Sequence, residues 1–129
     1  MRKIEETDNI SEMVLASFTD KEMQQDISIS RILSFPGLEI HLKEQTVYKD
    51  GVRIPFSHYE FYTLYYLAKH PGWVFTKKQI YEAVWKQPTE NCEAVVTNTI
   101  SHIRKKLHQE SPKDGYIKTV VNSGYKFEV

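Results

Sequence analysis

Residues 57–85 read SHYEFYTLYYLAKHPGWVFTKKQIYEAVW and contain the capping-box pattern S/T-x-x-E/Q twice. In this pattern the hydroxyl of the first residue accepts from the backbone N–H three residues later, and the side chain at that later position accepts from the first N–H. Ser57 and Glu60 therefore predict the start of one helix. Thr76 and Gln79 predict the start of a second, shorter helix.

Both predicted helices have a stop signal. The first should end at His70-Pro71-Gly72, because proline disfavours helical backbone in the residue before it, and Pro88 should close the second. The apolar positions that share one face of the first helix are Phe61, Leu64, Tyr65 and Ala68. The second helix runs through Ile80, Ala83, Val84 and Trp85. We expect the first to be a core helix.

A third helix is predicted from about Glu93 to Gln109, and turn-forming residues at 111–115 end it. At about 100° per residue, one narrow stripe of this helix is apolar. The stripe consists of Val96, Ile100, Ile103 and Leu107. The opposite face carries Asn98, Ser101, His102 and Lys105, with Arg104 and Lys106 on its flanks. No acidic residue occurs from Ala94 to Gln109, so we expect an acid-free outward face that meets an anionic partner.

Short β-prone runs flank the helices on both sides. Upstream, SRILSF, LEIHL, TVYK and VRI predict antiparallel strands. Asp50-Gly51 fits a two-residue hairpin turn, because both residues tolerate a positive φ. Downstream, YIKTVV and YKFEV predict a terminal hairpin around Asn122-Ser123-Gly124. The order of elements predicts an α+β fold with an N-terminal antiparallel sheet, three helices and a C-terminal hairpin.

The charged residues are unevenly distributed along the chain. Lys and Arg balance Asp and Glu at 17 each over 129 residues. Residues 1–30, however, hold three basic against seven acidic side chains, and residues 31–129 hold 14 against 10. The net charges are therefore −4 and +4, which separates an acidic leader, residues 1–30, from a mildly basic domain, residues 31–129.

The leader is expected to contain a helix. Ile10, Met13, Val14 and Phe18 have the spacing of one helix face. Three alternatives stay open for this apolar stripe: it docks on the domain, it pairs with a second copy, or the leader is a weakly ordered arm. The charge division adds the hypothesis that the leader folds over the basic third helix and competes with the anionic partner of that helix. Removal of residues 1–28 would then strengthen binding of that partner, whereas weaker binding would indicate a dimerising leader.

Several function classes lack a basis in the sequence. No apolar run approaches the 18 residues that suggest a membrane span, and the acidic N-terminus is unlike a secretory signal, so we expect a cytoplasmic protein without membrane contact. The single Cys92 allows no internal disulfide, and none of the five histidines forms a metal-ligand pair. No phosphate loop, nucleophile elbow or H-E-x-x-H helix occurs. We therefore predict no enzyme, no metal and no cofactor.

Residues 33–129 resemble the OmpR/PhoB-type effector domain of bacterial response regulators. The resemblance rests on VYKDGVRIPFSHYEFYTLYYLAKHPGWVFTKKQIYEAVW, VVTNTISHIRKKL and YIKTVVNSGYKFEV, in the family's order. It implies a winged helix-turn-helix whose third helix, about 93–109, enters the major groove of double-stranded DNA, with a wing at about 117–129. It also implies transcriptional control and a contact between loop 86–92 and RNA polymerase. Homodimers on repeated half-sites are expected for this motif class. The roughly 30 preceding residues are too few for the family's receiver domain, so we expect none in this chain.

The third helix and the hairpin supply the predicted DNA contacts. Asn, Ser, His and Lys suit base edges, and flanking Arg and Lys suit phosphates. The predicted base contacts are Asn98, Ser101, His102 and Lys105, and the predicted phosphate contacts are Arg104, Lys106, Lys118 and Lys126. The remaining candidates are Lys77, Trp85, Thr97, Asn122 and Ser123. Trp85 matches a family Trp that can lie near a phosphate, and burial against the third helix explains it equally well.

Two departures from the family pattern limit what the resemblance implies. Val121-Asn122 stands where the family usually has a basic residue before the wing glycine. Ala94, Thr97 and Ser101 stand where Arg or Asp is frequent, so the preferred DNA sequence cannot be transferred.

The alternative function is a protein-interaction adaptor that contacts RNA polymerase or another regulator. Zero net charge favours the adaptor, and the acid-free helix favours DNA. Steep salt dependence separates them, because only DNA binding releases condensed counterions.

Overall fold

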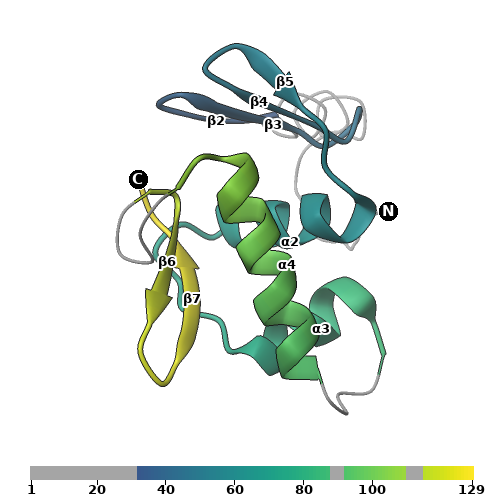
Figure 1. Cartoon of the computed structure of the whole chain (residues 1–129), viewed down its shortest axis with the longest axis vertical. Coiled ribbons are helices and arrows are strands. Elements are labelled where there is room, and N and C mark those ends of the chain that lie inside the picture. The colour runs from purple at the N-terminus through teal and green to yellow at the C-terminus, as the bar shows by residue number, and fades with distance from the viewer. Residues whose placement is uncertain (1–31, 88–91, 110–114) are drawn as a thin grey trace, which may run out of the picture. The chain divides into compact units, whose positions relative to one another are not determined.

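Four short strands begin the part of the chain that the computed structural model describes, which comprises residues 32–87, 92–109 and 115–129 (Figure 1). They are β2 (Ile32–Phe35), β3 (Leu38–His41), β4 (Thr46–Lys49) and β5 (Val52–Ile54), and they form one sheet in chain order. β4 pairs antiparallel with both β3 and β5. The predicted leader helix and the predicted boundary after residue 30 lie outside the described residues.

The turn between β4 and β5 is the predicted two-residue hairpin. Asp50 and Gly51 have positive φ angles of +53° and +81°, as type I′ geometry requires. Alternate side chains of this sheet, those of Leu38, Ile40 and Val47, are buried in the core that the sheet shares with the helices. The predicted N-terminal antiparallel sheet is therefore confirmed.

Both predicted capping boxes are present. Ser57 caps α2 (His58–Ala68): its hydroxyl accepts from Glu60 N at 3.2 Å, and Glu60 Oε1 accepts from Ser57 N at 2.9 Å. Thr76 and Gln79 make the matching pair at the start of α3 (Lys77–Trp85), at 3.0 and 2.9 Å. The two helix starts are therefore confirmed.

α3 ends at Trp85, the last residue predicted for it, and Lys86 follows with a left-handed φ of +58°. The third helix ends earlier than the sequence predicts. α4 (Cys92–Lys106) stops before the predicted end at Gln109, and His108 has a left-handed φ of +59°. A left-handed residue commonly terminates a helix, but that residue is usually glycine or asparagine. Neither Lys86 nor His108 carries that signal.

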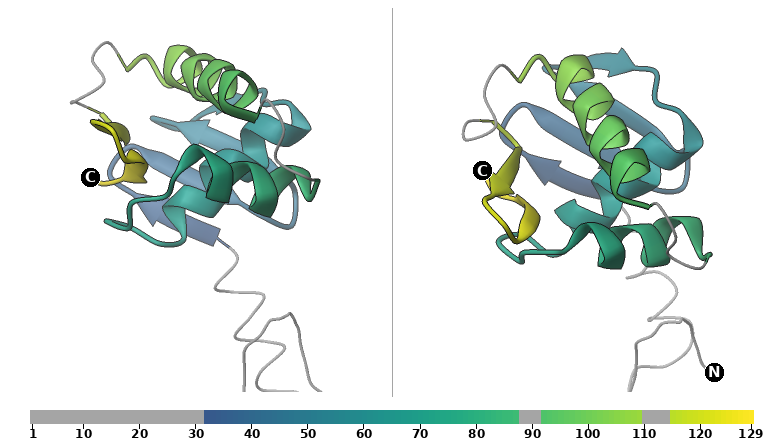
Figure 2. Two further views of the ribbon diagram at one scale, coloured as in Figure 1. Left: turned by 90° about the horizontal axis from the view of Figure 1, so that it is seen from below. Right: turned by 60° about the horizontal axis from the view of Figure 1, so that its bottom comes forward.

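The buried face of α4 matches the predicted stripe, and α4 packs against both α2 and α3 (Figure 2). The buried residues of the stripe are Val96, Ile100 and Ile103 in α4 and Leu107 directly after its last residue. In α2 the prediction is less accurate. Tyr65 is only partly buried, whereas Leu67, which the predicted face omits, is fully buried.

A hairpin of β6 (Ile117–Val120) and β7 (Gly124–Phe127) confirms the predicted C-terminal element. Two backbone hydrogen bonds join it to the connection between α2 and α3. Phe75 N donates to Tyr125 O at 2.9 Å, and Tyr125 N donates to Phe75 O at 3.0 Å. Gly124 has a φ of +138°, and a Cβ at this position would overlap the carbonyl oxygen of Phe75. The hairpin is thus fixed to the helices by main-chain contacts.

Candidate nucleic-acid interface

The outward face of α4 is exposed over most of its length. α2 and α3 cover the opposite, apolar face, and Figures 1 and 2 show α4 along the surface of the helical layer with the hairpin beside it. The exposed polar residues on the outward face are Thr97, Asn98, Ser101, His102 and Lys105. The structure therefore brings five of the predicted contacts together on one helix.

Glu60 places a carboxylate at the edge of this face. It comes from α2, and its side chain is only 11% exposed. Glu60 Oε1 accepts from Lys106 Nζ at 2.6 Å, and Glu60 Oε2 lies 3.6 Å from His102 Nδ1. The expectation of an acid-free outward face is therefore wrong at this edge, because another helix supplies the acid. Lys106 stays a predicted phosphate contact, but its ammonium already has an internal partner.

Glu60 is ionised at neutral pH. Burial alone would raise its pKa, but the hydrogen bonds from Lys106 and from the backbone N–H of Ser57 outweigh burial and hold the pKa below the ordinary value of 4.5. The capping box therefore provides more than a helix start. It holds a fixed negative charge beneath α4.

Arg104 links α4 to the hairpin. Its guanidinium donates to the carbonyl of Ile117 at 3.0 and 3.3 Å and to Thr119 Oγ1 at 2.7 Å, and it lies over the Tyr125 ring at 5.5 Å. The amide of Gln109 pairs with both backbone groups of Ile117, at 2.6 and 3.1 Å. These contacts fix the hairpin relative to α4. The phosphate role of Arg104 stays a prediction, and the structure gives this side chain partners within the domain.

The two hairpin lysines lie opposite each other on the strands. Lys118 and Lys126 are register partners, and both ammonium groups approach Glu128 Oε1, at 3.2 and 3.4 Å. Hydrogen bonds from the two lysines lower the pKa of Glu128, so this carboxylate is charged at neutral pH. The three side chains together keep one net positive charge, which is less than the two that the predicted phosphate contacts assume.

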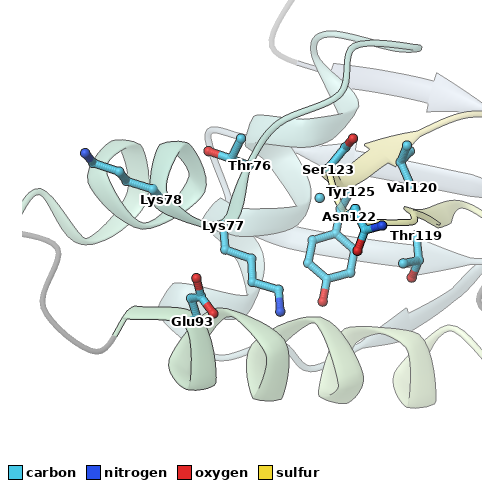
Figure 3. A pocket seen from close by; sticks show the side chains of 10 residues that line it. Thr76, Lys77, Lys78, Glu93, Thr119, Val120, Asn122, Ser123 and Tyr125 are labelled. Atoms are coloured by element: carbon cyan, nitrogen blue, oxygen red, sulfur yellow. The ribbon is translucent and has the colours of Figure 1, made fainter.

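A pocket of about 520 Å³ lies among the start of α3, the start of α4 and the turn of the hairpin. In Figure 3 the side chain of Lys77 points into this pocket toward α4, whereas that of Lys78 points away. Asn122 and Ser123 line the pocket from the hairpin turn, and Glu93 lines it from the first turn of α4. The predicted residues of α3 and of the wing turn therefore gather beside the N-terminal end of α4.

Trp85 is stacked between two tyrosines. Its ring centroid lies 4.7 Å from that of Tyr59 and 5.2 Å from that of Tyr81, with interplanar angles of 11° and 9°. Because Tyr59 belongs to α2, the stack fastens the end of α3 to α2. This packing accounts for a large aromatic residue at that position, and the predicted proximity of Trp85 to a phosphate stays a prediction.

The sequence did not indicate the site roles of Glu60 and Gln109. The capping box identified Glu60 only as a helix-start residue, and its contact with α4 depends on how α2 and α4 cross. Its position was nevertheless a partial signal, because a capping box holds a carboxylate in a defined place. Gln109 follows the last turn of α4 and had no signal, since its partners are backbone groups of β6.

Residues 32–87, 92–109 and 115–129 contain no helix with the length and apolar character of a membrane span. No three His, Cys, Asp or Glu side chains in those ranges are placed to hold a metal ion. Cys92, the first residue of α4, is buried and unbridged.

Residues 51–127 match the family model described as transcriptional regulatory protein, C terminal. The alkaline phosphatase synthesis transcriptional regulatory protein PhoP of Bacillus subtilis is 32% identical over 108 residues, which cover 83% of this chain and 42% of PhoP. The regulatory protein VanRc of Enterococcus gallinarum is 34% identical over 92 residues, which cover 71% of this chain and 40% of VanRc. The chain thus spans less than half the length of these curated relatives.

Solved structures have the same arrangement of elements. The DNA-binding domain of RstA from Klebsiella pneumoniae, in complex with the RstA box, superposes with a TM-score of 0.70 at 28% identity, covering 76% of this chain and 97% of that domain. DrrB of Thermotoga maritima, a response regulator and OmpR/PhoB homologue, superposes with a TM-score of 0.72 at 27% identity, covering 92% of this chain and 56% of DrrB. These likenesses confirm the predicted winged helix-turn-helix fold.

Proposed function

Because this chain belongs to the transcriptional regulatory protein, C-terminal family, as its OmpR/PhoB resemblance predicts, we propose that it binds double-stranded DNA as a transcriptional regulator. In this proposal α4 enters the major groove and the β6–β7 hairpin lies on the adjacent backbone or minor groove. The RstA structure, which contains DNA, supports this use of the fold. It does not transfer a DNA sequence to this chain.

The observation that carries the proposal is the exposed polar face of α4. The major groove admits one α-helix, and Asn, Ser, His and Lys side chains can hydrogen-bond to base edges there. Asn98, Ser101 and His102 are exposed on this face, where they could reach base edges. We assign base contacts to these three residues and to Lys105.

Phosphate contacts are proposed on this face and beside it. Lys105, to which we also assign a base contact, is exposed, and no carboxylate of the described residues lies within ion-pair distance of it, so its ammonium is open to a phosphate as well. Lys77, Asn122 and Ser123 gather at the pocket beside α4, and donors of these kinds contact phosphate oxygens in protein–DNA complexes. The ammonium groups of Lys118 and Lys126 are both paired with Glu128. To contact a phosphate they would have to weaken or break these ion pairs, so we expect the two hairpin lysines to contribute less to the affinity for DNA.

The proposal extends to partners that follow from the family. Loop 86–92 would contact RNA polymerase, and residues 88–91 of this loop lie outside the described part. Two copies of the chain would bind repeated half-sites about one helical turn of DNA apart. The protein would act in the cytoplasm, where bacterial DNA is found.

The salt dependence of DNA binding tests the proposal. We expect the full chain to bind a mixed-sequence duplex with an affinity that falls steeply as salt rises, because each neutralised phosphate adds about 0.9 to the log–log slope. A slope of about 2 to 4 would fit the cations assigned above. Fluorescence anisotropy over a salt series measures this slope. Failure to bind at the lowest salt would reject the proposal and favour the adaptor, whose partners would be sought among proteins.

Arg104→Gln separates a structural role from a phosphate contact. We expect this variant to lose about 2 kcal/mol of unfolding free energy, because the Ile117 carbonyl and the Thr119 hydroxyl lose a charged donor. Its salt slope for DNA should stay unchanged. Lys105→Gln is the matched control on the same helix: it should keep its stability within about 0.5 kcal/mol and lose about 0.9 from the slope. Urea unfolding and the anisotropy series give both quantities. If Arg104→Gln instead keeps its unfolding free energy and shows a smaller salt slope for DNA binding, Arg104 contacts a phosphate.

A further inference from the structure

The two oxygens of the Glu60 carboxylate have different neighbours. Oε1 accepts from the backbone N–H of Ser57 at 2.9 Å and from Lys106 Nζ at 2.6 Å. Oε2 faces Nδ1 of His102 at 3.6 Å. The Glu60 side chain is almost covered, whereas His102 is 59% exposed on the outward face of α4. A buried, fixed charge therefore lies behind an exposed imidazole that faces the proposed DNA site.

This geometry bears on which imidazole nitrogen carries the proton. A neutral histidine has one N–H donor and one acceptor nitrogen, and the partner of one nitrogen sets the role of the other. A carboxylate facing Nδ1 favours the proton on Nδ1, because the lone pair of an unprotonated Nδ1 would be repelled by the negative charge. Nε2 is then left as an acceptor. Lys106 reinforces this arrangement, since its ammonium keeps Glu60 ionised while occupying only Oε1.

We propose that Glu60 holds His102 in the tautomer protonated on Nδ1, so that Nε2 accepts a hydrogen bond from a base amino group in the major groove. In that groove the amino groups are N6 of adenine and N4 of cytosine. Guanine and thymine offer only acceptors, at O6, N7 and O4, and adenine offers the acceptor N7 beside its amino group. His102 would therefore favour adenine or cytosine at the position it contacts. The inference rests on the proposed DNA binding. Glu60 acts as a positioning residue that itself touches no base.

Glu60→Gln should change this preference. Glutamine also completes a capping box, and its carbonyl oxygen must take the place of Oε1, where Ser57 and Lys106 both donate. Its amide nitrogen then faces His102 Nδ1 as a donor, which makes Nδ1 the acceptor and leaves the proton on Nε2. Nε2 would now donate, so cytosine, which offers only a donor, would be disfavoured at the same position, and guanine, thymine or N7 of adenine would be accepted.

Nitrogen-15 NMR of the imidazole tests the tautomer without DNA. At about pH 8, where imidazole is ordinarily neutral, we expect the His102 Nδ1 signal of the full chain in the protonated range and the Nε2 signal in the unprotonated range. In Glu60→Gln the two should exchange. Thermal unfolding of the variant is measured alongside. The same tautomer in both proteins, with both folded, would overturn the role of Glu60 even if DNA binds as proposed.

Selection from a random duplex pool tests the base preference. We expect the full chain, Glu60→Gln and His102→Ala to select related motifs that differ at one position. That position should favour adenine or cytosine about fivefold in the full chain, exclude cytosine and admit guanine and thymine in Glu60→Gln, and lose its preference in His102→Ala. If the full chain and His102→Ala select identical motifs, His102 does not determine the base at this position, and the proposal is wrong. If the full chain binds no duplex in the salt series, the proposed function fails first, and the NMR result still decides the tautomer.

Discussion

Gly124→Ala is expected to lower the free energy of unfolding by about 4 kcal/mol. Two costs combine at this position. The φ of +138° is rarely adopted by residues with a side chain, and a Cβ would overlap the backbone carbonyl of Phe75, which cannot move without breaking its bond to Tyr125. Strain of this kind costs about 1–3 kcal/mol, and overpacking costs about as much again. Urea unfolding followed by circular dichroism measures the loss.

Gly72→Ala is the matched control for this prediction. Gly72 also has a positive φ, +84°, but no atom lies within 4 Å of the position that its Cβ would take. Only the backbone cost of about 1 kcal/mol should remain. The difference between the two variants then isolates the overlap with Phe75. Equal losses in both would show that the hairpin can move away from the α2–α3 connection at little cost.

Lys105→Glu is expected to weaken DNA binding about 30- to 100-fold at moderate salt, which corresponds to about 2–3 kcal/mol. The substitution removes a cation from the exposed face of α4 and places an anion against the DNA. Because Lys105 is exposed and α4 keeps its buried stripe, the fold should be retained. Anisotropy titration at fixed salt measures the affinity, and circular dichroism checks the fold.

Lys43→Glu controls for the change in net charge. Lys43 is exposed in the turn between β3 and β4, outside the proposed interface, and the substitution changes the charge of the chain by the same amount. Its affinity should fall less than about threefold, because a distant charge is largely screened at moderate salt. A comparable loss in both variants would show that binding follows overall charge and that α4 is not the contact surface.

Local patterns in the sequence predicted most of the fold. The two capping boxes placed the starts of α2 and α3, and the Asp50-Gly51 pair placed a hairpin turn, because each depends on residues close together in the chain. The stripe on α4 was also predictable, since its four members repeat at the helical period. The end of α4 was less predictable, because His108 adopts a left-handed backbone although histidine is not a typical residue at that position.

The candidate site was predictable only where it depends on one element. The helical spacing of residues in the third helix identified the exposed side chains, and the structure agrees that these side chains are exposed. What surrounds them is set by packing between elements. Glu60 approaches from α2, Arg104 turns toward β6, and Glu128 holds both hairpin lysines. Charge counted along the chain therefore overestimated the positive charge available at the interface.

The pairing of Phe75 with Tyr125 has a consequence for the order of synthesis. The two residues are about 50 positions apart, and their mutual hydrogen bonds satisfy backbone groups beside the core. Ile117 and Phe127 of the same hairpin are fully buried. While the ribosome has made the three helices but not yet this hairpin, the apolar surface that the hairpin covers remains open to water. Distant contacts of this kind form only after the chain between them is complete, so the nascent domain acquires its final packing only once the hairpin has been synthesised.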